Sequence, residues 1–214
     1  MSFWFRSIME DKFKGRIDSL FPTSIGFFKL FPLTEQNKKY FYEEENNLIC
    51  NYGNMRTKND RILDNEEALD LKNNILECVS IYINYIYKNP KNIYLQLTQS
   101  WINVTTENQY HHIHNHPNSF ISGVYYYDVH DKEQISFTDF SKFNTIEIHP
   151  TEWTKENSLT WTYDMSDNDL ILFPSSLNHE VPYKKTKFKR KSLAFNIFVR
   201  GTFGCQEKLN MLEL

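Results

Sequence analysis

The chain has 214 residues and a formal net charge of −3 at pH 7, and 40% of its residues are hydrophobic and 16% aromatic. This composition can bury a sizeable core and excludes a disordered chain, while the counts of six glycines and seven prolines exclude collagen-like and linker-like sequences. The nearly balanced charge gives no electrostatic reason to expect a nucleic-acid or membrane-surface partner, and we expect one domain over residues 1–214.

The cysteines and the N-terminal residues indicate in which cellular compartment the protein is expected. Cys50, Cys78 and Cys205 are far apart and form no CxxC pair, which excludes a disulfide framework and a zinc ribbon. The first residues, MSFWFRSIMEDKFKG, carry charges before any apolar run reaches the length of a secretory signal or a membrane span. We therefore expect a cytoplasmic protein with no membrane partner.

The first elements predicted along the chain are a short strand at 25–30 and a helical polar segment at 34–47. The clearest helix is expected from about Asn65 to Tyr87, with Asp64 and Glu67 as a capping pair and Pro90 just beyond its end. Its apolar residues recur at steps of three or four and would form one stripe: Leu71, Ile75, Val79, Tyr82 and Ile86.

After Pro90 the hydrophobic period changes from helical to two residues, which is typical of strands. Strands are predicted at 93–103, 110–116, 120–129, 135–140, 159–163, 169–173, 180–183 and 192–199. Eight strands behind a helical part predict a mainly β (α+β) fold, a double-sheet jelly roll or cupin-like barrel. Its core would cover about 91–204, with the N-terminal helical part, about 1–90, packed on one sheet.

Histidines are concentrated between residues 111 and 116. In an extended strand His112, His114 and His116 would project from one face, so that either the 112/114 or the 114/116 pair could bind one metal ion. The alternative is a polar strand end with solvated histidines. A third imidazole, His179, follows a predicted strand and a turn that would return it toward the same end of the barrel.

The segment 190–199 has two different faces at period two. Leu193, Phe195 and Ile197 form an apolar face, whereas Arg190, Ser192, Ala194 and Asn196 form a small, polar one. A guanidinium with a hydroxyl beside it can bind a carboxylate group. The lysines at 184, 185, 187, 189 and 191 are interpreted as a solvated basic loop, and Trp101 as a core residue.

These motifs resemble the Fe(II)- and 2-oxoglutarate-dependent oxygenases, and most closely a group of such oxygenases found in phages and bacteria. The resemblance covers about residues 20 to 204. Its main stretches are Trp101-Ile-Asn103, His114-Asn-His-Pro-Asn-Ser119, Ser122-Gly-Val-Tyr-Tyr126, Leu172-Phe-Pro-Ser175 with His179, and Arg190-Lys-Ser-Leu-Ala-Phe-Asn196.

The resemblance implies a double-stranded β-helix that holds Fe(II) and uses 2-oxoglutarate as cosubstrate. His114, His116 and His179 would be the metal ligands, and His116 would stand where the family has an Asp or Glu. Arg190 and Ser192 would bind the distal carboxylate of 2-oxoglutarate, with Tyr126 aimed at the same group and with Asn103 and Asn196 lining the pocket. Asp139 is a further carboxylate that could lie near the barrel, although a solvated strand end is the simpler interpretation for it.

The predicted function is therefore an oxygenase that hydroxylates an unidentified substrate and releases succinate and CO2, in the host cytoplasm if the chain is phage-encoded. One alternative is a three-histidine, cupin-type metal dioxygenase that does not use 2-oxoglutarate. The other is a non-catalytic phage or bacterial binding module whose 184–191 lysine run holds an acidic partner. The sequence does not specify an oligomeric state.

Overall fold

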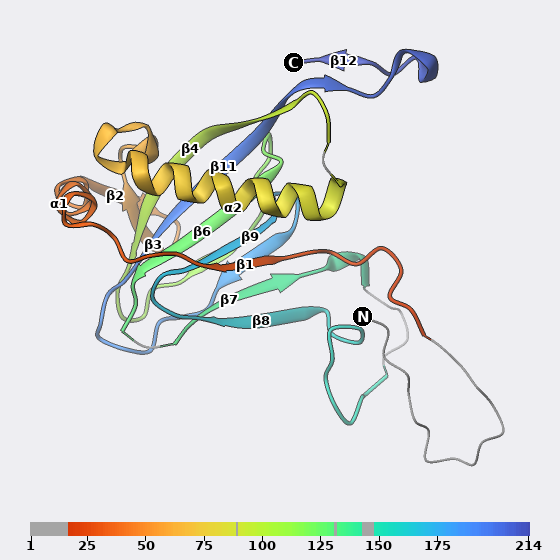
Figure 1. Cartoon of the computed structure of the whole chain (residues 1–214). Coiled ribbons are helices and arrows are strands. Elements are labelled where there is room, and N and C mark those ends of the chain that lie inside the picture. The colour runs from red at the N-terminus through yellow and green to blue at the C-terminus, as the bar shows by residue number, and fades with distance from the viewer. Residues whose placement is uncertain (1–16, 89, 131, 143–147) are drawn as a thin grey trace.

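The computed structural model describes residues 17–88, 90–130, 132–142 and 148–214, and it contains two β-sheets with helices on one side (Figure 1). The α-helices are α1 (Glu35–Glu44) and α2 (Leu69–Tyr87). The strands of the first half are β1 (Gly26–Lys29), β2 (Leu48–Asn51), β3 (Asn54–Thr57), β4 (Ile93–Thr105), β5 (His111–His114) and β6 (Ile121–Asp128). Those of the second half are β7 (Glu133–Thr138), β8 (Thr160–Met165), β9 (Asp169–Pro174), β10 (Asn178–Val181), β11 (Arg190–Phe203) and β12 (Leu212–Glu213).

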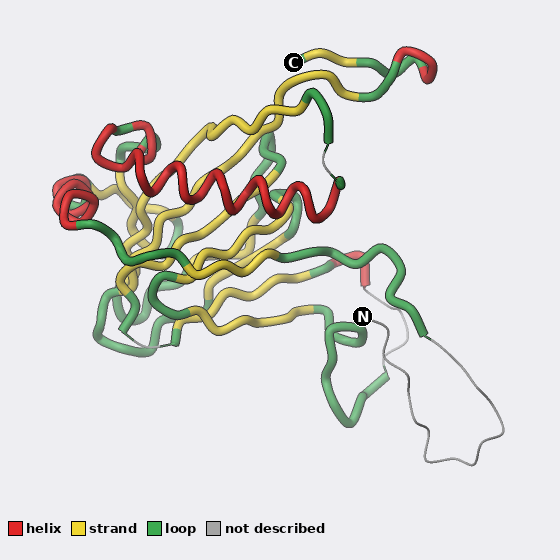
Figure 2. Tube along the Cα trace, in the orientation of Figure 1, coloured by secondary structure: helices red, strands yellow, loops and turns green. Residues whose placement is uncertain are grey.

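All strand pairings between these elements are antiparallel. The large sheet has the order β1-β9-β6-β11-β4-β3-β2, with β12 paired to the end of β11, and the small sheet has the order β5-β10-β7-β8. The prediction of a mainly β fold with few helices is confirmed. In Figure 2 the longest helix, α2, runs across the strands of the large sheet.

A side-chain cap begins α1, and another begins the 3₁₀ turn that precedes α2. Thr34 caps α1 in a reciprocal pair with Asn37, as expected for the polar segment at 34–47. Two 3₁₀ turns, Ile62–Asp64 and Glu66–Ala68, precede α2, and the side chain of Asn65 accepts a hydrogen bond from the backbone N–H of Glu67. The prediction that Asp64 forms this cap is wrong, because Asp64 pairs with Lys72 at 2.8 Å instead.

One core lies between α2 and the large sheet. The predicted stripe of α2, from Leu71 through Ile75 and Val79 to Tyr82, is buried there against alternate residues of the sheet. Those sheet residues include Ile102, Tyr125, Leu172, Leu193, Phe195 and Ile197. The apolar face predicted for 193–197 is therefore the face that contacts the helical layer.

A second, smaller core lies between the two sheets. It contains Tyr126, Ile135, Phe137, Met165, Ile171 and Phe173. Neighbouring residues of the central strands thus face opposite layers, as Tyr125 and Tyr126 on β6 show. The large sheet is buried on both faces, and its inner face is directed toward the small sheet, where the predicted site residues lie.

Several elements differ from the predicted ones. The β2–β3 hairpin turns through Tyr52 (φ 45°) and Gly53 (φ 125°), and it was not predicted because each of its strands is only four residues long. Strand β5 ends at His114, so that His116 lies beyond it. None of the described helices is both long and apolar enough to span a membrane, and the N-terminal residues 1–15, which suggested a cytoplasmic location, lie outside the described residues.

The close packing of β6 on its neighbours makes Gly123 a testable position. A Cβ atom at residue 123 would lie 2.3 Å from Cζ of Phe195 and 2.7 Å from Cδ2 of Leu172. We expect Gly123→Ala to lower the free energy of unfolding by about 1–3 kcal/mol, because the buried ring must move. Urea denaturation measures this change, and Asn73→Ala on the exposed side of α2 is the control. Equal stability of Gly123→Ala and the unsubstituted protein would contradict the packing described here.

Candidate metal centre

Three of the predicted metal ligands meet where the small sheet faces the large one. His114 on β5 lies directly opposite His179 on β10, and the backbone N–H of His116 donates to the carbonyl of Ser175 at 2.9 Å. The ring centroids are separated by 5.0 Å (His114–His116), 4.3 Å (His114–His179) and 5.1 Å (His116–His179). One ring nitrogen from each of the three lies within 4.8 Å of the others, which is close enough for one ion to bind all three.

Hydrogen bonds and burial prepare these rings to act as ligands. Nδ1 of His114 lies 2.7 Å from the carbonyl of His112, and Nδ1 of His179 lies 3.0 Å from that of Leu177. A neutral imidazole that donates from Nδ1 presents its lone pair at Nε2. Burial lowers the pKa of His116 to about 4, and it also lowers the pKa of His114 and holds that of His179 well below its usual value. The rings are therefore uncharged at pH 7, the form that binds a metal ion, and this donor set fits a divalent transition metal.

A second histidine group overlaps the first. His111, His112 and His114 also have ring nitrogens within 4.8 Å of one another, and the rings of His111 and His114 are stacked with centroids 4.3 Å apart. The rings of His112 and His114, and those of His114 and His116, are 5.0 Å apart, and all three residues line one cleft, as predicted for a shared face. The pairing of β5 with β10 shifts register between His114–His179 and His111–Val181, and His111 also lies beside His114, which was not predicted. Since Nδ1 of His114 is engaged, its Nε2 can serve one of the two groups at a time.

The predicted cosubstrate residues line a narrow cavity beside the three histidines. Ser192 pairs with Asn103 on β4 and with Tyr126 on β6, so these three side chains form a row across the large sheet. The lining also includes Trp101, Val124, Ile135, Val181, Arg190 and Ala194. Asn103 accepts a hydrogen bond from Asn51 at 3.3 Å, and burial raises the pKa of Tyr126 to about 12, so its phenol is neutral.

Asn196 and Trp101 lie in positions that differ from the predicted ones. Asn196 hydrogen-bonds Ser122 at 2.8 Å and lines an open cleft next to the cavity rather than the cavity itself. Trp101 is not a core residue, because it is only partly buried and borders both the cavity and the cleft, with its ring 5.8 Å from that of His116. Asp139 accepts hydrogen bonds from Ser141 and lines a different groove, away from the histidines.

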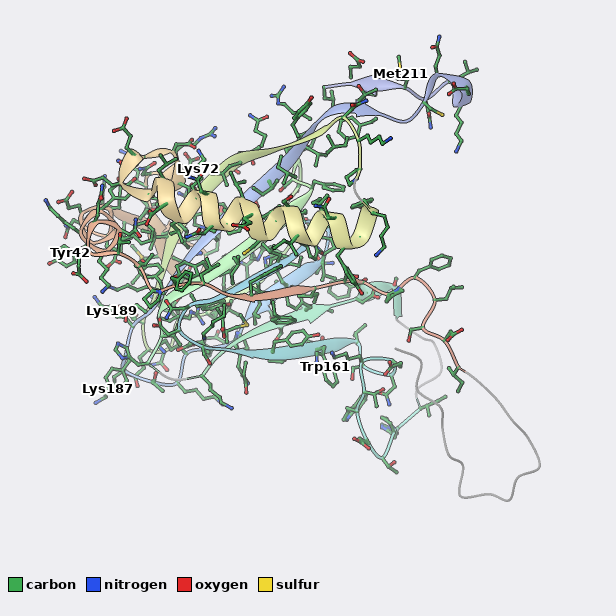
Figure 3. The ribbon with its side chains drawn as sticks, in the orientation of Figure 1. Tyr42, Lys72, Trp161, Lys187, Lys189 and Met211 are labelled. Atoms are coloured by element: carbon green, nitrogen blue, oxygen red, sulfur yellow. The ribbon has the colours of Figure 1, made fainter. Side chains whose placement is uncertain are left out.

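Arg190 is buried at one end of the cavity and is held by protein groups. Its Nη2 donates to Oγ1 of Thr105 at 2.8 Å, and its Nη1 donates to Oε2 of Glu133 at 3.1 Å. The ammonium of Lys184 bonds the other oxygen of Glu133. The expectation of a fully solvated lysine loop is therefore wrong for Lys184, which is 4% exposed, but it holds for Lys187 and Lys189 at the edge of the molecule (Figure 3).

Glu133, Thr105, Lys184 and His111 also line or contact the site, and they are not among the predicted site residues. A signal was present for Glu133, because at period two it shares the face of Ile135 and Phe137, which are buried between the sheets. No comparable signal exists for Lys184, which lies outside a strand in a run of lysines and is buried by its pairing with a residue 51 positions away.

Comparison with known proteins finds a family match over the segment that contains most of these site residues. Residues 99–196 match the model of the family described as "Putative 2OG-Fe(II) oxygenase". The resemblance to the 2OG-Fe(II) oxygenases is confirmed. The family named in this way uses the two predicted cofactors, Fe(II) and 2-oxoglutarate, and the matched segment contains the three histidines, Arg190 and Ser192. No curated protein sequence matches the chain significantly.

Solved structures share the fold at low sequence identity. HygX from Streptomyces hygroscopicus, solved with nickel and 2-oxoglutarate, is 11% identical with a TM-score of 0.55, and the match covers 82% of each chain. A prolyl-4-hydroxylase from Pseudomonas putida is 14% identical with a TM-score of 0.51, covering 81% of this chain and 92% of that one. The epimerase SnoN from nogalamycin biosynthesis is 11% identical with a TM-score of 0.53, covering 82% and 80%. The two-sheet fold is thus similar to that of these three enzymes.

The two overlapping histidine groups lead to a test of the ligand set. We expect His114→Ala and His179→Ala to abolish tight binding of Co(II), which anaerobic titration detects by its visible absorption. His116→Ala should weaken Co(II) binding by more than about 100-fold, because losing a residue that only hydrogen-bonds a metal ligand costs at most about that much. His112→Ala should leave Co(II) binding nearly unchanged. His116→Asp should retain the metal because it supplies a carboxylate at the same position.

The opposite pattern of Co(II) binding among these variants would place the metal in the second histidine group. Loss of Co(II) binding in His111→Ala and His112→Ala, with full binding in His116→Ala, would mean that the metal lies between His111, His112 and His114.

Proposed function

We propose that the protein is an Fe(II)- and 2-oxoglutarate-dependent oxygenase that hydroxylates an organic substrate and releases succinate and CO2. His114, His116 and His179 would hold the iron, and Arg190 with Ser192 would bind the distal carboxylate of 2-oxoglutarate. The observation that carries the proposal is that the three imidazoles and the guanidinium line one cavity between the sheets. The two sheets would form the jelly roll of that superfamily, in a single domain over residues 1–214.

The metal and its cosubstrate supply the oxidising chemistry when they are bound, and the protein supplies orientation. The carbonyls of His112 and Leu177 fix the rings of His114 and His179, which leaves Nε2 of each ring free to bind a metal ion. Arg190, held by Thr105, fixes the far end of a dicarboxylic acid. A chain bound between these two ends would lie along Ala194 and Ser192.

The walls of the cavity are suited to exclude water. Val124, Ile135, Val181 and Ala194 surround the space between the histidines and Arg190 with apolar side chains. A dry environment strengthens the ion pair between a ligand carboxylate and the guanidinium. Tyr126, neutral at pH 7, can add a hydrogen bond from its hydroxyl to the same carboxylate without adding charge.

The substrate would approach from the cleft beside the cavity. This cleft has a volume of about 230 Å³ and shares His111, His114 and His116 with the cavity, whereas Arg190 lines the cavity and not the cleft. Its lining is mostly polar, with Asn51, Arg56, Asp60, Gln99 and Asn196 around the partly exposed ring of Trp101. These groups can hydrogen-bond and stack against a polar organic molecule.

The donor set also favours one alternative. Three histidines without a carboxylate would suit a metal dioxygenase that does not use 2-oxoglutarate. The two functions differ in whether 2-oxoglutarate binds and is consumed. The binding-module alternative has less support, because Lys184 is buried against Glu133 and Lys191 is paired with Glu45 and Asp128, so the lysine run forms no continuous basic surface.

The cosubstrate assignment is tested by Arg190→Lys. This substitution keeps the charge but removes the planar fork, so the binding free energy of 2-oxoglutarate should fall by about 1.5–3 kcal/mol. Anaerobic calorimetry in the presence of Co(II) measures it. Lys189→Ala is the control and should bind as the unsubstituted protein does. Equal affinity in Arg190→Lys would remove Arg190 from the cosubstrate site.

Turnover provides a second test. We expect slow conversion of 2-oxoglutarate to succinate without added substrate, because the cosubstrate can be oxidised uncoupled from substrate. The rate should depend on added Fe(II) and stop with a chelator, and His179→Ala should be inactive. Succinate formation that is insensitive to both iron and chelator would contradict the proposed function.

A further inference from the structure

Behind the Arg190 end of the cavity lies a buried group of three charged side chains, Lys184, Glu133 and Arg190. The side chains are 2%, 9% and 3% exposed, respectively. Glu133 uses one carboxylate oxygen for each cation, Oε1 for Lys184 and Oε2 for Arg190. Buried charges are costly unless they are paired, so this group must have a geometry that offsets the loss of hydration.

Four segments hold the group in place. Glu133 begins β7 of the small sheet, and Arg190 begins β11 of the large sheet beside Thr105 of β4. Lys184 follows β10, and its backbone exchanges hydrogen bonds with the β4–β5 loop at Asn108 and Gln109. Its ammonium also donates to Thr186 at 2.9 Å. The ion group therefore connects the two sheets at the end of the cavity.

The charges of this group do not cancel. Two cations share one carboxylate, which leaves one positive charge in a buried position. Lys191, the next residue on β11, contrasts with this arrangement, because it lies between two carboxylates, Glu45 at 2.9 Å and Asp128 at 3.2 Å. Of the three charged residues in the ion group, Arg190 lines the cavity. Its guanidinium has further N–H groups besides those that donate to Glu133 and Thr105, and through these a ligand can contact the excess positive charge.

We propose that Lys184 and Glu133 are positioning residues that set the charge of the cosubstrate site, so that it accepts one carboxylate group. This rests on the proposed function, in which a dicarboxylic acid binds with its far end on Arg190. Glu133 orients the guanidinium through Nη1, and Lys184 compensates the charge of Glu133. With a ligand carboxylate in place, two cations and two carboxylates alternate and the buried charge is neutralised.

Charge counting gives a specific expectation for variants. Lys184→Met leaves Arg190 neutralised by Glu133, so an incoming carboxylate would be an uncompensated buried charge. Affinity for 2-oxoglutarate should then fall by about 30-fold, the effect of a unit charge about 8 Å away at an effective dielectric constant of about 20. The double variant Lys184→Met/Glu133→Gln restores one net positive charge on Arg190, and its affinity should return to within about threefold of the unsubstituted protein.

The experiment measures binding of two ligands to the Co(II)-loaded protein by anaerobic calorimetry. 2-Oxoglutarate carries the distal carboxylate, and 2-oxopentanoate has the same 2-oxo acid end and chain length without it. The loss in Lys184→Met and the recovery in the double variant should appear for 2-oxoglutarate alone. Lys191→Met is the matched control, since it removes a lysine from the neighbouring position and should change neither affinity by more than about twofold.

The possible outcomes distinguish a failure of the charge-setting proposal from a failure of the proposed function. Recovery in the double variant supports the charge-setting role, because a merely structural bridge would affect both ligands alike. Full affinity in Lys184→Met, or loss for both ligands without recovery, would overturn it, and circular dichroism shows whether the variant is folded. If the unsubstituted protein itself does not bind 2-oxoglutarate in the presence of metal, it is the proposed function that fails.

Discussion

The burial of both faces of β11 is the constraint on which the site depends. One face, with Leu193, Phe195 and Ile197, packs under the helical layer, and the other, with Ser192 and Ala194, faces the small sheet. A shift of β11 by one residue against its neighbours would move the apolar face into the cavity and the polar face under α2. The close approach of Gly123 to Phe195 helps to fix that register. The position of Arg190 relative to the histidines follows from it.

Burial also determines the charge state of each site residue. The histidines lose hydration and are neutral, because their pKa values are lowered, which suits them to bind a cation. The guanidinium of Arg190 cannot lose its proton, so it is buried only with a counter-charge, which Glu133 provides. One physical effect, desolvation between two sheets, thus produces an uncharged end and an ion-paired end in the same cavity.

Much of this arrangement could be predicted from local sequence patterns. The periods of two and 3.6 residues predict the strands and the stripe of α2, and the two faces of the 190–199 segment follow from alternation alone. Long-range pairing could not be predicted in the same way. The irregular register of β5 against β10, which brings His111 beside His114, depends on the partner strand, and the burial of Lys184 depends on a carboxylate 51 residues away. Neither the register of β5 nor the burial of Lys184 can be predicted from the local sequence.

The distribution of charge explains how such a site can lack a carboxylate beside the metal. In the resemblance to the oxygenases, the acid position next to His114 is taken by His116, so the three proposed ligands themselves carry no negative charge. The nearest carboxylate to Arg190, that of Glu133, lies behind the cavity, where Lys184 offsets its charge. The cavity therefore has a positive excess at the Arg190 end and neutral donors at the histidine end. Under the proposed function, a dianionic ligand would meet favourable charge at both ends only when a metal cation is present, so cosubstrate binding should depend on metal binding.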